Sequence, residues 1–304
     1  MSASKSPSRC AEWAREVGVD PAGTAPRSDV FVIVEHPLPW PSKLSDDPLL
    51  DWLERTALEA AGPGRLLRLQ AVAVGRTQPV RRVIVFNSGS PPFSGYSRSE
   101  AVGTPEQLPG LVASLVMAEP APVSLKKVTD VLVCTHGSRD TCCGSLGTRL
   151  WRDLEDGLEG IRVWRTSHTG GHRFAPNAIT FPDGNYWGYL DVEVLRGVVN
   201  RSMSADVAAA HLRGCAAFSP KVQVADRAVL ARRGWGWLGC YRSGEELSSH
   251  RVELTFESFD GERGGYLVGV EETRMMPVPD CGGDPANAAK FHPEFAVSHL
   301  EVSM

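Results

Sequence analysis

Apolar and polar positions alternate with two different periods along the first part of the chain. Between the first two apolar runs, residues 48–61 repeat apolar positions at the spacing of a helix, and a shorter helix is expected at 10–17. An apolar run, a helix and another apolar run are typical of a βαβ unit, so residues 1–127 are predicted to form an α/β region. The runs expected to be strands are 30–36, 66–74 and 81–87.

The same alternation of strand and helix patterns returns in the middle of the chain. Residues 128–218 are therefore predicted to form a second α/β unit, which opens on a strand whose apolar residues end at Cys134. Pro-Asp-Gly-Asn inside 178–191 is typical of a hairpin turn. The segments expected here are strands at 128–136 and 162–168, helices at 147–160 and 204–213, and the hairpin 178–191.

Residues 219–304 show a third pattern, rich in Trp and Gly at first. Two segments of alternating polarity, 250–259 and 265–276, are joined by DGERGG and predict a half-buried hairpin that pairs onto a neighbouring sheet. The chain shows no internal sequence repeat and no low-complexity tract. The predicted fold class is therefore α/β with two α/β regions and a C-terminal β-hairpin extension.

Composition and charge narrow the function classes. The chain has 304 residues, of which 42% are hydrophobic, and a formal charge of −4, so nucleic acid is not an expected partner. The opening residues lack the apolar stretch of a signal peptide, and no apolar run approaches the ~20 residues of a membrane span. We therefore expect no membrane association and a cytoplasmic location. Thiols stay reduced there, so seven cysteines, three of them in CTHGSRDTCCGSLG (134–147), indicate metal or redox chemistry.

Two loops carry the candidate chemistry. Cys134 lies where a strand ends, and Cys143 lies at the start of the following helix, where free N–H groups stabilise a thiolate or an anionic metal centre. The next strand leads into SHTGGHRFAPN, which contains His168 and His172. Loops at the carboxyl ends of neighbouring parallel strands meet, so two thiols and two imidazoles are expected to converge.

These segments resemble a known family. CTHGSRDTCCG and SHTGGHRFAPNAITFPDGNYWGYLD are similar to the hallmark motifs of the sucrase/ferredoxin-like family, and AGTAPRSDVFVIVEHPLPWP is similar to that family's opening segment. The resemblance spans roughly residues 10 to 215. It implies a thioredoxin-like ferredoxin domain at 128–218, preceded by a region that is itself a candidate for a thioredoxin-like fold.

The resemblance also implies a cofactor, a [2Fe–2S] cluster bound by Cys134, Cys143, His168 and His172. Two neutral imidazoles in place of two thiolates make such a cluster less negative, which raises its reduction potential, and their second nitrogens couple reduction to protonation. The expected function is electron transfer between redox partner proteins, a reductase and an acceptor.

Four nearby residues are candidates for supporting roles. Cys142 is interpreted as a neighbour of the site rather than a ligand. Arg139 either pairs with Asp140 or offsets the charge of the centre, and Asn177 either braces the histidine loop or is a plain turn residue. His136 lies two residues after Cys134 and is expected to point the opposite way if the strand persists, which makes it a supporting residue rather than a ligand. Cys281 resembles a loop cysteine without a mate; the remaining three, Cys10, Cys215 and Cys240, are interpreted as small buried hydrophobes.

Other functions remain open at this level. Two Cys and two His also suit zinc, which would make the chain a zinc-stabilised binding protein, and an iron–sulfur sensor that acts through a protein partner has the same ligands. A thiol oxidoreductase using Cys142 and Cys143 lacks Cys-x-x-Cys spacing. A sucrase is not expected, because no motif nominates the carboxylate pair that glycoside hydrolysis requires.

Overall fold

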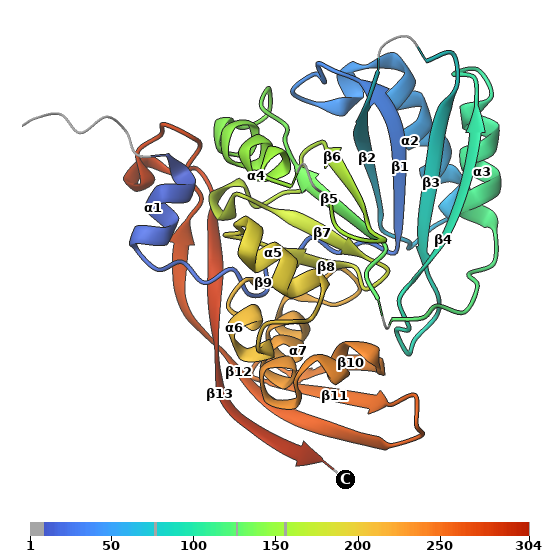
Figure 1. The fold of residues 1–304 in the computed structure, drawn as a ribbon. Helices are drawn as coiled ribbons and strands as arrows, with labels where there is room; N and C mark the ends of the chain where they lie inside the picture. Colours follow the sequence, from blue (N-terminus) through green and yellow to red (C-terminus); the bar gives the residue numbers. More distant parts are fainter. Residues whose placement is uncertain (1–8, 76–77, 126, 155–156, 304) are drawn as a thin grey trace, which may run out of the picture.

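A nine-stranded mixed sheet forms the centre of the molecule in the computed structural model, which describes residues 9–75, 78–125, 127–154 and 157–303 (Figure 1). The strand order is β4-β3-β1-β2-β6-β5-β7-β8-β9. Its strands are β1 (Val30–Pro37), β2 (Leu67–Val74), β3 (Arg81–Ser88), β4 (Tyr96–Gly103), β5 (Asp130–Cys134), β6 (Arg162–Thr166), β7 (Ala178–Phe181), β8 (Asn185–Trp187) and β9 (Leu212–Cys215).

The two halves of this sheet repeat one topology. In the first half β1 is parallel to β2 and antiparallel to β3, which pairs with β4. In the second half β5 is parallel to β6 and antiparallel to β7, which pairs with β8. Each half thus has the strand order of a thioredoxin-like domain, and the halves join where β2 meets β6 in an antiparallel pair. The sequence shows no repeat because this topology needs only a matching pattern of polarity.

The first strand is buried on both faces, which explains its unbroken apolar run. Val30, Val32 and Val34 pack under helices α2 (Pro48–Ala61) and α3 (Leu108–Met117). The side chains between them belong to a separate core shared with the second half, in which the ring of Phe31 meets that of Phe181 edge-on with centroids 5.0 Å apart. The α/β packing expected for residues 1–127 is therefore present.

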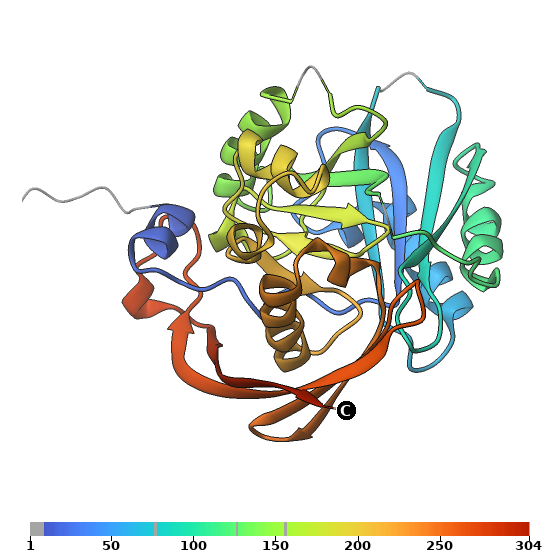
Figure 2. The same ribbon diagram turned by 60° about the horizontal axis from the view of Figure 1, so that its bottom comes forward.

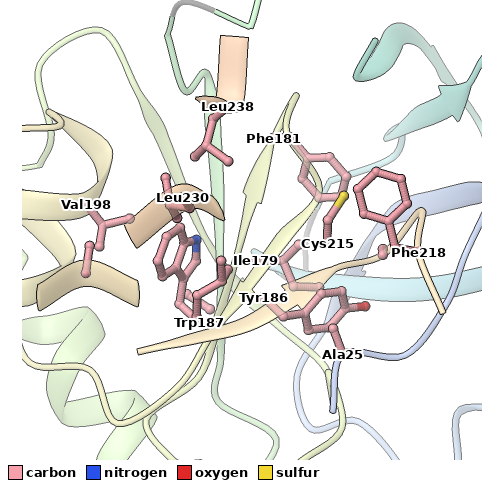
Figure 3. Packing of buried hydrophobic residues seen from close by; sticks show 14 of the residues in the cluster. Ala25, Ile179, Phe181, Tyr186, Trp187, Val198, Cys215, Phe218, Leu230 and Leu238 are labelled. Carbon is pink, nitrogen blue, oxygen red and sulfur yellow. The ribbon is translucent and has the colours of Figure 1, made fainter. Parts of the chain in front are cut away.

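The second half is covered by short helices. They are α4 (Thr148–Arg152), α5 (Val192–Val199) and α6 (Ala205–Ala209), and they surround the core that Figure 3 shows around Trp187 of β8 and Leu230. The helix expected at 147–160 ends at Arg152, and residues 155–156 lie outside the described part of the chain. The helix expected at 204–213 is shorter, because its last residues form β9.

The C-terminal region is larger than the expected hairpin. It is a four-stranded antiparallel sheet, β10-β11-β12-β13, packed against helix α7 (Pro220–Arg233). Its strands are β10 (Tyr241–Ser248), β11 (Arg251–Glu257), β12 (Arg263–Pro277) and β13 (Phe291–Ser303). Figure 2 shows β12 and β13 curving past α7, with their far end beside helix α1 (Cys10–Glu16). Within the described ranges, no helix is long and apolar enough to cross a membrane.

Candidate functional site

The segment 134–147 turns sharply from a strand into a helix. Cys134 is the last residue of β5, and Asp140 caps the following helical segment, since its Oδ1 accepts a hydrogen bond from the backbone N–H of Cys143 at 3.0 Å. That segment contains a π-helical turn, η2 (Cys143–Gly147), before α4 begins. Both thiols are buried, with Cys134 0% and Cys143 1% exposed. The expected strand-to-helix position of these two cysteines is present.

Gly147 allows the helix to contact the end of the strand. A Cβ at this position would lie 1.9 Å from the carbonyl oxygen of Cys134, well inside any tolerable contact. The backbone of the π-turn therefore packs directly on the backbone of β5. This close approach keeps Cys143 beside Cys134.

Replacing Gly147 by alanine is expected to destabilise the protein by about 2 kcal/mol or more, because backbone atoms on both sides must move apart. Gly110→Ala is the matched control, since Gly110 lies in helix α3 with open space around it and should stabilise by about 0.5 to 1 kcal/mol. Chemical denaturation of both variants measures the difference. Equal stability of the two variants would contradict this packing.

His168 reaches the two cysteines from the loop after β6. One donor atom each from Cys134, Cys143 and His168 lie within 4.8 Å of one another. We call these three residues the inner group. The Nδ1 atom of His168 is buried and has no hydrogen-bond partner within the described part of the chain. Burying a nitrogen without a hydrogen-bond partner costs folding free energy, so this atom is suited to bind a metal.

His136 positions the backbone of His168. Its Nδ1 accepts a hydrogen bond from the His168 N–H at 3.0 Å, and its Nε2 donates to the carbonyl of Pro41 at 2.9 Å. Burial lowers the pKa of His136, which favours the neutral ring that these two bonds require. The first half of the sheet also contributes, since Gln70 of β2 donates to the carbonyl of His168 at 3.3 Å. His136 thus supports the histidine loop without contacting the inner group through its own ring nitrogens.

His172 lies beside the inner group, with its ring centroid 6.3 Å from that of His168. It begins the turn η3 (His172–Phe174), and its Nδ1 lies 3.0 Å from Oδ2 of Asp140 and 3.2 Å from Sγ of Cys10. Of the four ligands that the sequence predicts, Cys134, Cys143 and His168 converge, and His172 lies next to them. A carboxylate on one imidazole nitrogen is the usual partner of a metal-ligating histidine, and it leaves Nε2 for the metal.

Arg213 of β9 holds the histidine loop from behind. This guanidinium is 1% exposed and donates to the carbonyl of Gly170 at 2.9 Å and to Oδ1 of Asn177 at 3.3 Å. Asn177 in turn donates to the carbonyl of Gly171 at 3.0 Å. Gly171 has φ +68°, and a Cβ there would lie 2.4 Å from Nη2 of Arg213, so glycine is required. Sequence reasoning missed Arg213, because no local pattern marks an arginine as buried.

The charge state of the inner group is set by its hydrogen bonds. The thiol of Cys143 and the ring of His168 hold the pKa of Cys134 well below its usual value despite burial, while the pKa of Cys143 is raised well above it. The hydrogen bond between the two thiols therefore favours the thiolate form of Cys134 over that of Cys143. Burial raises the pKa of Asp140, but the hydrogen bonds from His172 and from backbone N–H groups outweigh it and lower the pKa overall.

The remaining nominated residues lie apart from the inner group. Arg139 is exposed. Of its two expected roles, the ion pair with Asp140 is absent from the described residues, where Asp140 faces His172 instead. The thiol of Cys142 contacts the thiols of Cys10 and Cys281. Cys10 is therefore more than the small buried hydrophobe that was expected, and Cys281 has sulfur partners that the sequence did not indicate. The hydrogen bond from the Cys10 thiol has the largest effect and, together with the one from Cys281, lowers the pKa of Cys142 to about 6.

The fold and the site together define a class. Two thioredoxin-like halves carry a buried cysteine–histidine group at the carboxyl end of a strand pair, a donor set that can bind a soft metal. A model of the sucrase/ferredoxin-like family matches residues 21–214, and the chain belongs to this family.

A curated relative gives a narrower likeness. The chain is 32% identical over 91 residues to altered inheritance of mitochondria protein 32 of Meyerozyma guilliermondii. This match covers 26% of the chain. The match spans about a third, 32%, of that relative's length. No solved structure matches the chain.

Proposed function

We propose that this protein transfers electrons through one [2Fe–2S] cluster held by Cys134, Cys143, His168 and His172, and that it exchanges electrons with a reductase and an acceptor protein. The observation that carries the proposal is the convergence of two buried thiols and the unpartnered Nδ1 of His168. The family to which the chain belongs supports a ferredoxin-like role. The bound cluster would supply reversible uptake of one electron at a potential above that of ferredoxins with four cysteine ligands.

His172 is the fourth ligand in this proposal. The carboxylate of Asp140 accepts the Nδ1–H of His172, which fixes the tautomer and the ring orientation and presents Nε2 for iron. The inner group alone has three donors, so a fourth from the adjacent ring completes the set that two irons require. His172 is therefore a ligand whose position depends on Asp140.

The four ligands differ in solvent exposure, and this difference indicates which side of the site a partner can reach. The two cysteines are buried, whereas both imidazoles are partly exposed, with the side chain of His172 at 16%. Electrons and protons would thus enter and leave through the histidine rings. A partner protein would dock over the loop 168–172.

Asp140→Asn tests the contribution of the carboxylate. Asparagine can still accept the hydrogen bond from His172, so the cluster should assemble. It lacks the negative charge of aspartate, so the reduction potential should rise by tens of millivolts, which for one electron corresponds to about 1 kcal/mol. The redox-linked pKa should fall, because the charge that favours a protonated imidazole is gone. Protein-film voltammetry against pH measures both, and an unchanged potential would contradict the contact. Asp153→Asn, an exposed residue after α4, is the control.

The colour and metal content of the purified protein test the proposal as a whole. We expect a red-brown protein with two irons per chain and visible bands that bleach with dithionite. Zinc in place of iron, in a colourless protein, would instead support the zinc-stabilised binding protein.

A further inference from the structure

A second group of metal-binding side chains lies next to the inner group and shares none of its residues. It consists of Cys10, Cys142, Cys281 and Asp140, whose donor atoms all lie within 4.8 Å of one another. We call these four residues the outer group. They come from the start of helix α1, from the turn after β5, and from the loop between β12 and β13. Three thiols from segments more than 130 positions apart in the chain meet at one point.

The distances within the outer group suit a single metal ion. The Sγ atom of Cys10 lies 3.5 Å from that of Cys142 and 3.4 Å from that of Cys281, and the last two are 2.7 Å apart. Thiolates bound to tetrahedral zinc at about 2.3 Å are about 3.8 Å apart, so two of the three separations are close to that geometry and the third widens on binding. All seven cysteines are free, and the sulfurs are farther apart than the ~2.05 Å of a disulfide.

Asp140 and the surroundings complete a tetrahedral set. Its Oδ1 lies 3.9 Å from Sγ of Cys281, so the carboxylate faces the thiols as well as His172. Cys10 is 1% and Cys142 0% exposed, which shields the site from water, while Cys281 is partly exposed and leaves a path for the ion. Arg173, 3% exposed, is the nearby cation: burial lowers the pKa of its guanidinium, and negative charge on Cys10 opposes that lowering. It would offset part of the negative charge of three thiolates and a carboxylate.

We propose that the outer group binds one zinc ion through Cys10, Cys142, Cys281 and Asp140. Thiolate-rich tetrahedral sites favour zinc, and three thiolates with one carboxylate oxygen form a closed structural site. The ion would fasten helix α1 and the far end of the β12–β13 hairpin onto the loop that carries the inner group. Figure 1 shows helix α1 beside the loop that joins β12 to β13, and Figure 2 agrees. The site goes beyond the proposed electron transfer, since its metal would be structural.

Metal analysis of the full-length protein, purified under reducing conditions from cells supplied with iron and zinc, tests this site. We expect about one zinc per chain, which falls by about tenfold or more in Cys281→Ser and in Cys10→Ala while iron stays at the wild-type level. Cys240→Ser is the matched control, because Cys240 is buried away from both groups and should leave both metals unchanged. Cys281 lies in a partly exposed loop, so its variant should fold. X-ray absorption at the zinc edge should show three sulfur neighbours at about 2.3 Å and one oxygen.

Three results would overturn the zinc site. One is wild-type protein that holds no zinc even after incubation with zinc chloride and a thiol reductant. Another is a Cys142–Cys281 disulfide as the main species in mass spectra of unreduced peptides. The third is zinc that is lost in Cys134→Ala and kept in Cys281→Ser, which would place zinc in the inner group and refute the iron–sulfur proposal as well. Zinc that follows Cys281 in a protein without iron would refute the iron–sulfur proposal alone.

Discussion

Replacing Cys134 by alanine is expected to abolish cluster assembly, with iron and visible absorbance reduced by about tenfold or more. Cys134 is fully buried at the end of β5, and its thiolate is stabilised by Cys143 and His168. Without it, iron would lose a strong anionic ligand that no neighbouring side chain of the inner group can replace. Cys143→Ala should give the same loss. Iron content and absorption spectra of the purified variants measure the effect.

The choice of Cys143 over its neighbour is tested by the same assay. Cys142→Ala should keep its iron, because the thiol of Cys142 faces the outer group. Cys215→Ala, at a buried cysteine in β9, controls for the loss of a buried thiol in general. Iron that survives in Cys143→Ala but is lost in Cys142→Ala would reverse the assignment.

Replacing His168 or His172 by cysteine is expected to keep the cluster but to lower its reduction potential by on the order of 100 mV, because a neutral ligand becomes an anionic one. The pH dependence should also flatten. Reduction makes the iron less positive and raises the pKa of a bound imidazole, so reduction takes up a proton and the potential falls as pH rises. A thiolate carries no such proton. Redox titration at several pH values measures both effects.

A matched substitution separates this effect from a general change of charge. His250 is exposed in the turn between β10 and β11, and His250→Cys should leave the potential and its pH dependence unchanged. If the potential of the His168 and His172 variants stayed at the wild-type value, neither ring would be a ligand.

Much of the fold could be predicted because its strands and helices have strong local patterns. The helical period at α2 reflects packing within the first half of the chain. The unbroken apolar run at β1 reflects burial on both faces, one under α2 and α3 and the other in the core shared with the second half. Strand β10 was missed because YRSGEELS is polar and mostly exposed, so only pairing with β11 makes it a strand. Strand β13 likewise depends on β12 for its pairing.

The part of the candidate site that depends on strand topology could be predicted from the sequence, and the part that depends on long-range packing could not. Parallel strands β5 and β6 end side by side, so the loops carrying Cys134 and His168 meet, as expected. The convergence of Cys10 and Cys281 depends on how α1 and the β12–β13 hairpin pack, and no local pattern encodes that contact. Arg213 was missed for the same reason. The sequence left open whether Arg139 pairs with Asp140 or offsets the charge of the centre, and it gave no sign that Asp140 lies against His172.

Electron paramagnetic resonance of the dithionite-reduced protein tests the central claim most directly. Two histidine ligands should give a signal with a low average g-value and pulsed spectra that show two nitrogens strongly coupled to the unpaired electron. A signal without nitrogen coupling, or a protein that stays silent and holds a single zinc in the inner group, would contradict ligation of one [2Fe–2S] cluster by two cysteines and two histidines.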